Sequence, residues 1–312
     1  MNSPVEIANI YLGIGIKKVR RPLIKTFILS IIGGFFLGAS SLLSNVCSYN
    51  YSEGLGQFYF GLVFPIGIMA VYCAGAELFT GNCLLTIPLL NGNIIWIEIL
   101  LNWLISFVGN FIGAILLSVL VVYGKVTNLF NKTLAQIAII TGTEKTKLGF
   151  GEAFVKGMLC NFYNCLAIWV SLGGKELRSV ILGLWTPIFL FASCNLEHSI
   201  ANMYYIPAGL FASYEYGLDR PSLSWGRLFY KNLIPVTLGN IIGGGALVGI
   251  VYWYIYLKKN EQDNPSSIPS QLVIIRTSNL KIKNSYHYAD SSQSELQVKN
   301  YMNTIQVIKA LN

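Results

Sequence analysis

An acidic residue and an imidazole stand next to each other in an apolar part of the sequence. Glu197 and His198 occur in the stretch LEHSIANMYYIPAGL, which comes shortly after the apolar run SVILGLWTPIFLF. An ionisable group at the depth of a bilayer costs at least a few kcal/mol, so it usually serves a function. Because imidazole titrates near pH ~6.5 in water, His198 could donate a hydrogen bond to a passing anion or lend it a proton. A histidine satisfied within the core is the structural alternative.

A second acidic stretch lies at a matching position earlier in the chain. CAGAELFTGN places Glu77 and an Asn 120 residues before Glu197 and its Asn, with the same five-residue step. We expect Glu77 and Glu197 to hold two irregular loops by accepting backbone amide hydrogens, and ion coordination is the alternative. Leu78 stands where the second copy has His198. A histidine without a counterpart is therefore the candidate for chemistry.

The composition indicates an integral membrane protein. Hydrophobic residues make up 54% of the chain and charged residues 12%, against about 25% charged in soluble domains. A spanning helix needs ~20 apolar residues. Six segments meet this requirement, at about residues 26–46, 57–90, 97–123, 150–172, 179–213 and 232–257. The net charge of +8 indicates orientation at a membrane surface and attraction of anions rather than nucleic-acid binding.

The second and fifth segments are too long for one ordinary span, and the two acidic stretches interrupt them. Interrupted spans at corresponding positions of two halves predict a binding site. NWLISFVGNFIGA and NLIPVTLGNIIGG repeat a second pattern 130 residues apart. Three helices followed by three predict an inverted repeat, with half-helices that begin near Thr80 and Ser199 and point their amide ends at a common centre. Chance similarity between glycine-rich helices is the alternative.

The apolar segments contain no pattern of catalytic or metal-binding residues. There is no HExxH, no set of paired metal ligands and no nucleophile with a neighbouring base, and the six cysteines lack CxxC spacing. The sequence therefore predicts no enzyme, no metal and no cofactor, and cysteines that serve packing. A neutral-solute channel of the aquaporin type is an alternative, but it would leave His198 unexplained and the paired Asn-Pro-Ala motifs are missing.

The chain divides into an N-terminal segment (1–25), a transmembrane transport domain (26–257) and a polar C-terminal tail (258–312). Nine basic residues lie near the N-terminus, in the fourth connection and after the last span, against seven on the other side. This bias is small, but it favours both termini in the cytoplasm of a multi-pass cell membrane protein. Residues 294–311 of the tail could form a short amphipathic helix.

Four stretches resemble the formate/nitrite transporter family, and most of all its bacterial formate channel branch: LEHSIANMYYIPAGL, NLIPVTLGNIIGGGALVGIVYWYIYL, CAGAELFTGN and GNFIGA. The resemblance runs from about residue 18 to residue 257. It implies an all-α, aquaporin-like protomer of six transmembrane helices, with helices 2 and 5 broken, assembled in the bilayer as a homopentamer with one pore per subunit. The implied substrate is a small monovalent anion, formate first, with nitrite, hydrosulfide, acetate or lactate as alternatives. Whether protons move with the anion stays open.

The resemblance also implies roles for individual residues. His198 corresponds to the central histidine, Thr80 to the threonine of the first broken loop and Asn202 to the asparagine beyond the histidine. Lys145 corresponds to the basic residue of the outer vestibule, which draws anions in. The apolar constrictions correspond to Phe64, Ile68, Leu78 and Phe191, and Phe79 follows Leu78 in the same loop.

Two constriction positions depart from the family pattern. Asn164 stands where an aliphatic residue is usual, and Ile68 stands where the formate channel has Leu. A polar Asn164 would widen or wet one constriction. The selectivity inherited from formate channels is therefore in question.

Overall fold

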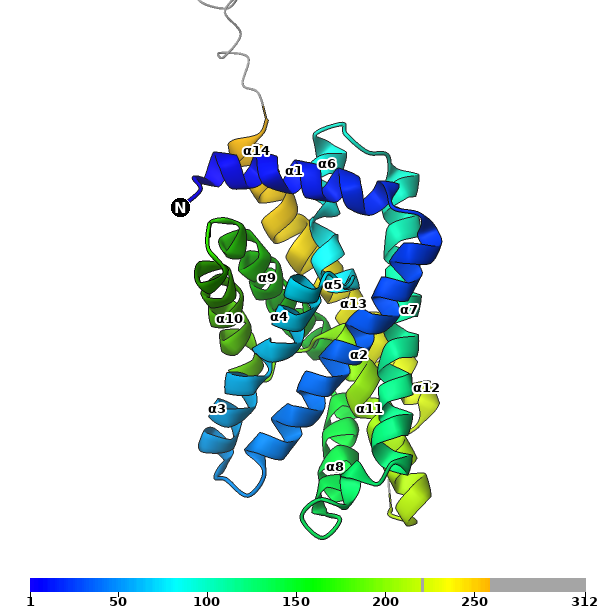
Figure 1. Cartoon of the computed structure of the whole chain (residues 1–312). Coiled ribbons are helices and arrows are strands. Elements are labelled where there is room, and N and C mark those ends of the chain that lie inside the picture. The colour runs from blue at the N-terminus through cyan, green and yellow to red at the C-terminus, as the bar shows by residue number, and fades with distance from the viewer. Residues whose placement is uncertain (220–221, 259–312) are drawn as a thin grey trace, which may run out of the picture. The chain divides into compact units, whose positions relative to one another are not determined.

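Long apolar helices dominate the described part of the chain, which comprises residues 1–219 and 222–258 of a computed structural model. Five helices in this part are long and apolar enough to cross a membrane (Figure 1): Leu23–Ser48, Glu53–Ala74, Trp96–Tyr123, Phe150–Leu172 and Trp225–Tyr256. Two shorter apolar helices, Phe79–Leu90 and Leu177–Ser193, lie in the second and fifth predicted segments. The polar tail from residue 259 onward, with its predicted amphipathic helix, lies outside the described residues.

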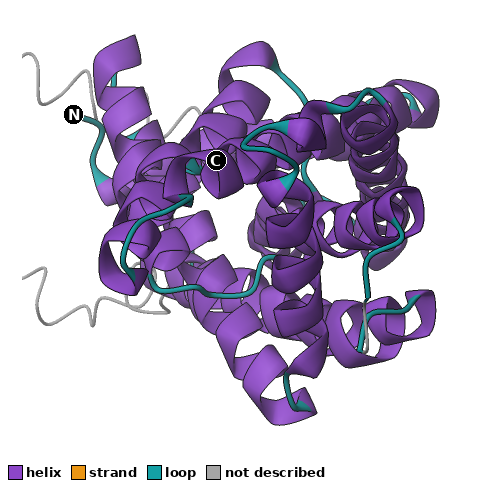
Figure 2. Ribbon diagram, turned by 90° about the horizontal axis from the view of Figure 1, so that it is seen from below, coloured by secondary structure: helices purple, strands orange, loops and turns teal. Residues whose placement is uncertain are grey.

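The described helices follow one another with short connections (Figure 2). In chain order they are α1 (Pro4–Arg20), α2 (Leu23–Ser48), α3 (Glu53–Val63), α4 (Pro65–Ala74), α5 (Phe79–Asn82), η1 (Cys83–Leu85), α6 (Thr86–Leu90), α7 (Trp96–Tyr123), η2 (Val126–Asn128), α8 (Thr133–Lys147), α9 (Phe150–Leu172), α10 (Leu177–Ser193), α11 (Ser199–Tyr216), α12 (Trp225–Arg227), η3 (Leu228–Leu233), α13 (Ile234–Ile241), η4 (Ile242–Ile250) and α14 (Val251–Tyr256). The last five form one continuous helical run, in which η3 and η4 are π-helical.

Two apolar segments are interrupted at matching places. α4 ends at Ala74 and α5 begins at Phe79, whereas α10 ends at Ser193 and α11 begins at Ser199. Gly75 ends α4 with φ +79°, a left-handed conformation that glycine adopts without steric cost. The loops at 75–78 and 194–198 therefore contain the two acidic residues Glu77 and Glu197.

Glycines bring two pairs of helices into backbone contact. A Cβ on Gly113 of α7 would lie 1.9 Å from the Ile31 carbonyl oxygen of α2, and one on Gly243 of η4 would lie 2.0 Å from the Met158 carbonyl oxygen of α9. The two glycines are 130 residues apart and their partners 127. Small residues at a helix interface let helices approach closely in a bilayer. These two glycines do so between helices of one subunit.

Replacing Gly243 by Val should destabilise the protein, because η4 and α9 would have to separate. Overpacking of this kind costs about 1–3 kcal/mol, so the thermal unfolding midpoint in detergent should fall by several degrees. The control is Gly151→Val on α9, where an added Cβ meets nothing within 4 Å. Equal midpoints for the two variants would contradict this account of helix packing.

Two helices were not expected from the sequence. α1 runs across the ends of α6 and α14 (Figure 1) and contacts both. It begins with a capping box, in which Ser3 Oγ accepts from the Glu6 amide and Glu6 accepts from the Ser3 amide. That pattern, with proline at the first helical position, indicates the N-terminus of a helix. α8 packs against α11. The N-terminal segment and the connection before α9 are thus ordered helices that can carry functional side chains.

Candidate functional site in the two interrupted segments

His198 and Thr80 meet where α11 and α5 begin. Thr80 Oγ1 lies 3.0 Å from His198 Nε2, and the two residues are 118 apart in the sequence. Both side chains are buried. The fold therefore joins the asymmetric histidine to the threonine of the other interrupted segment.

The remaining contact of the ring determines its tautomer. His198 caps α11, because its Nδ1 accepts a hydrogen bond from the Ala201 amide at 3.3 Å. A backbone N–H can only donate, so Nδ1 carries no hydrogen in this arrangement. The neutral ring therefore holds its hydrogen on Nε2 and donates it to Thr80 Oγ1.

Aromatic rings close the space on one side of the histidine. The Phe191 ring stacks on the His198 ring with centroids 6.1 Å apart. Phe64 meets Phe191 edge to face at 5.8 Å. The cavity beside His198 is only about 10 Å³ and is also lined by Phe64, Phe191 and Asn202, which leaves room for about one water molecule at most. This side of the histidine is closed in the structure.

Larger cavities lie on either side of this narrow region. One of about 290 Å³ is lined by Ile68, Leu78, Asn164, Lys18 and Arg21, among others. Another of about 410 Å³ has Lys145, Glu197 and Asn195 in its wall. Lys18 lies on α1 and Lys145 in the last turn of α8, and Figure 1 shows α1 across the upper end of the bundle and α8 in its lower part.

Phe79, which the resemblance counts with the constriction residues, is not among the residues that line these cavities. Its ring packs edge to face against Phe107 at 5.3 Å and Trp103 at 6.1 Å, and both partners belong to α7. The side chain turns toward a neighbouring helix because the chain turns into α5 at this residue. Leu78, one position earlier, lines the 290 Å³ cavity.

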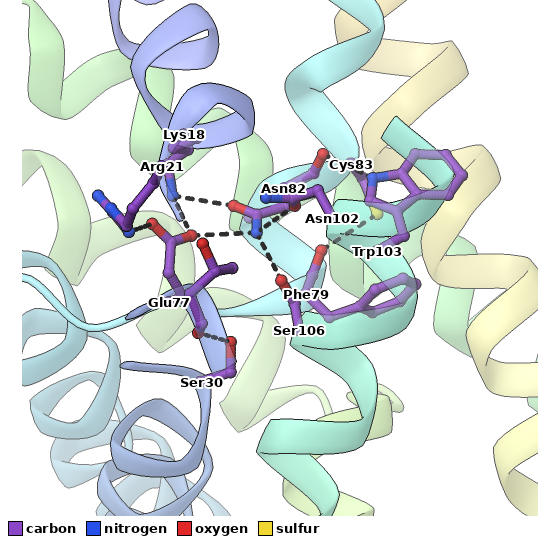
Figure 3. Close-up of polar contacts among 12 residues, drawn as sticks. Lys18, Arg21, Ser30, Glu77, Phe79, Asn82, Cys83, Asn102, Trp103 and Ser106 are labelled. Carbon is purple, nitrogen blue, oxygen red and sulfur yellow. Dashed lines mark hydrogen bonds and ion pairs between the residues drawn. The ribbon is translucent and has the colours of Figure 1, made fainter. Parts of the chain in front are cut away.

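Glu77 is held by side chains and not by backbone amides, which corrects the expectation for this residue. Its carboxylate accepts from Lys18 Nζ at 2.7 Å and Asn82 Nδ2 at 3.0 Å, and it also pairs with Arg21. Figure 3 shows both basic side chains reaching this carboxylate from above, and Asn82 extending the network toward Asn102. Neither Lys18 nor Arg21 was expected from the sequence as a partner of Glu77.

Glu197 has the equivalent partners in the second half, so the expectation of amide contacts is wrong here too. Its carboxylate accepts from Lys145 Nζ at 2.7 Å, Asn202 Nδ2 at 2.7 Å and Asn232 Nδ2 at 3.2 Å. Lys145 is only 8% exposed. Its ammonium is therefore a buried ion-pair partner, and the residue also lines the 410 Å³ cavity.

Two asparagines hold the irregular loops instead. Asn110 Oδ1 accepts from the Phe79 amide at 2.9 Å, while its Nδ2 donates to the carbonyls of Glu77 and Ser30. Asn240 repeats the pattern in the second half, with the partners Ser199 N, Glu197 O and Gly157 O. Both follow a glycine in the repeated stretches NWLISFVGNFIGA and NLIPVTLGNIIGG. The repeated Gly-Asn pair could have indicated these two asparagines from the sequence, but it did not show that they hold the loops.

The sequence profile of the formate/nitrite transporter family matches residues 5–254. The chain belongs to the formate/nitrite transporter family. The match begins earlier than the resemblance noted from the motifs and takes in nearly all of α1. Members of this family are membrane transporters and channels, so the protein is a transporter and not an enzyme.

The matches to known relatives span almost the whole length of those proteins. A "Probable formate transporter" of Methanothermobacter thermautotrophicus is 34% identical over 82% of this chain and 98% of its own. "Formate channel FocA" of Escherichia coli (strain K12) is 33% identical over 83% of this chain and 95% of its own. Among solved structures, a "Pentameric formate channel with formate bound" matches with a TM-score of 0.67 and 30% identity over 76% of this transporter and 98% of that chain. The all-helical transport fold is therefore shared.

Proposed function

We propose that this transporter is a channel for small monovalent anions, formate first, with a separate pathway in each subunit. The contact between His198 Nε2 and Thr80 Oγ1 carries the proposal. It joins the starts of two apolar helices in a buried region between two cavities. Relatives described as formate channels support formate over the other anions of the family.

The ring can stabilise an anion by hydrogen bonding. A carboxylate that leaves water loses its hydration, and a buried N–H donor offsets part of that cost. His198 Nε2 carries such a hydrogen, and Thr80 can turn its own hydroxyl hydrogen toward the solute. The amide ends of α5 and α11 add positive potential at the same place. Asn202 beside the histidine completes this pathway, and Phe64 with Phe191 restricts it to small solutes.

Movement of a proton with the anion requires a further step. The neutral ring has one hydrogen, and the Ala201 amide blocks protonation at Nδ1 in this arrangement. We infer that His198 first serves as a hydrogen-bond donor, and that it delivers a proton only when the start of α11 moves away. Simultaneous recording of current and pH during formate entry tests this. A proton flux equal to the formate flux would contradict hydrogen-bond donation as the main role of His198.

The architecture that we propose is six membrane crossings in an inverted repeat of three and three, with helices 2 and 5 broken, assembled as a homopentamer. The matching partners of Glu77 and Glu197 support the repeat, and the similarity to a pentameric formate channel supports the assembly. α1 contacts α14, so the first helix and the last described helix lie at the same end of the bundle. Six crossings would place both termini on the same side of the membrane, and the small excess of basic residues near them favours the cytoplasm.

Light scattering by proteoliposomes tests the substrate. Vesicles containing the protein should respond to formate at least about ten times faster than empty vesicles, nitrite should follow, and glycerol should give no increase over empty vesicles. The physical reason is that the hydrogen-bond donors and positive helix ends favour an anion. A response to glycerol without one to formate would favour the neutral-solute channel instead.

A further inference from the structure

Asn164 lines the 290 Å³ cavity and carries an unused hydrogen-bond acceptor. The residue lies on α9, is fully buried and lines this cavity with the apolar side chains of Ile68 and Leu78. Within the described part of the chain, its Oδ1 has no hydrogen-bond partner. Buried polar atoms are nearly always paired, so an unpaired one beside a cavity points to something that enters the cavity.

The neighbouring asparagine fixes which end of the Asn164 amide is unused. Asn161 Nδ2 donates to two carbonyl oxygens, those of Thr80 at 3.1 Å and Asn240 at 2.7 Å. Its Oδ1 is therefore the only atom that it can offer to Asn164, and it accepts from Asn164 Nδ2 at 2.9 Å. A flipped Asn164 amide would set two oxygens against each other. Oδ1 of Asn164 must be the atom left over.

A carbonyl oxygen accepts hydrogen bonds and cannot donate them, so it repels an anionic carboxylate. It stabilises a solute that carries an O–H group. Two small solutes supply that chemistry: a monocarboxylic acid in its neutral form, through the carboxyl O–H, and a 2-hydroxy acid, through its alcohol O–H. Ile68 and Leu78, which line the same cavity, offer such a group no hydrogen-bond partner.

We propose that Asn164 Oδ1 accepts a hydrogen bond from the O–H group of the permeating solute, so that residue 164 determines selectivity on this side of the histidine. The inference rests on the proposed function and specifies the form of the solute that this cavity favours. It makes Asn164 a selectivity residue and not only a polar break in an apolar constriction.

The test compares Asn164→Val with Asn164→Thr in proteoliposomes, using formate, acetate and glycolate. Val and Thr have the same shape, but only Thr retains an acceptor. Acetate and glycolate differ by one hydroxyl group. If the alcohol O–H is the donor, Asn164→Val should lower the ratio of glycolate to acetate uptake about five-fold. If the carboxyl O–H is the donor, formate and acetate uptake should fall together by about five-fold and the ratio should stay constant. Thr should restore part of either loss.

A matched control lies one turn along α9. Ile168→Val shortens another side chain in the wall of the same cavity and leaves the acceptor in place, so its ratios should equal those of the wild type. Unchanged rates in both Asn164 variants, or equal losses in Val and Thr, would overturn the inference, because shape and not the acceptor would then decide. Wild-type vesicles that take up none of the three solutes would overturn the proposed function itself.

Discussion

Replacing His198 by Phe is expected to reduce formate uptake into proteoliposomes by about 100-fold, because a hydrogen bond to a charged group contributes roughly 1.5–3 kcal/mol and the variant loses the Nε2 donor. Phe has a similar ring but no polar atom, so the dehydrated carboxylate keeps only the Thr80 hydroxyl as a donor beside the Phe191 ring. Uptake is measured by light scattering on vesicles that contain equal amounts of folded protein.

His198→Asn separates hydrogen bonding from proton transfer. Asparagine is a good helix N-cap, so its Oδ1 can accept from the Ala201 amide as His198 Nδ1 does. Its Nδ2 can still donate toward the pathway, but the side chain does not titrate. If donation is the main role, this variant should retain uptake within about ten-fold of the wild type. Normal uptake by the Phe variant would remove the histidine from the mechanism altogether.

Replacing Glu197 by Ala is expected to destabilise the protein by about 3–5 kcal/mol, because it leaves the buried ammonium of Lys145 without a counter-charge. The pair has an Nζ to Oε1 distance of 2.7 Å, and both side chains are largely withdrawn from solvent. Asn202 and Asn232 lose an acceptor at the same time. The fraction of protein that survives heating in detergent, followed by size-exclusion chromatography, gives the measurement.

The first half of the chain supplies a matched comparison. Glu77→Ala also removes a carboxylate, but its partners Lys18 and Arg21 are 21% and 28% exposed and can turn toward water. Its loss of stability should therefore be clearly smaller than that of Glu197→Ala. The double variant Lys145→Met, Glu197→Gln should recover much of the stability, because it removes both buried charges. If Glu77→Ala were the more damaging change, burial of the ion pair would not govern stability here.

The two interrupted segments share the contacts that hold their loops but differ in the residue that precedes the following helix. Asn110 and Asn240 fix the two loops through equivalent contacts, whereas the residue before each half-helix differs: Leu78 in one and His198 in the other. His198 meets Thr80, and Leu78 lines the cavity that contains Asn164. One scaffold thus supports a polar contact on one side and an apolar wall on the other.

The sequence by itself was sufficient to predict features that depend on residues close together in the chain. Apolar length indicated a membrane protein, the acidic stretches marked both interruptions, and the motifs indicated the family. These features can be predicted because bilayer thickness and helix geometry constrain residues that are neighbours in the sequence. The asymmetry of His198 could also be read directly, since it needed only the comparison of two short stretches.

The tertiary structure alone decided the partners of those residues. Lys18 lies 59 residues from Glu77, and Lys145 lies 52 from Glu197, so no local pattern joins them. The packing of Phe79 against α7 and the unpaired oxygen of Asn164 likewise depend on which helices touch. Helix packing brings together residues that are remote in the chain, and a buried charge or amide takes whichever partner that packing supplies. For this reason the sequence located the site, whereas its contacts became visible only in the folded chain.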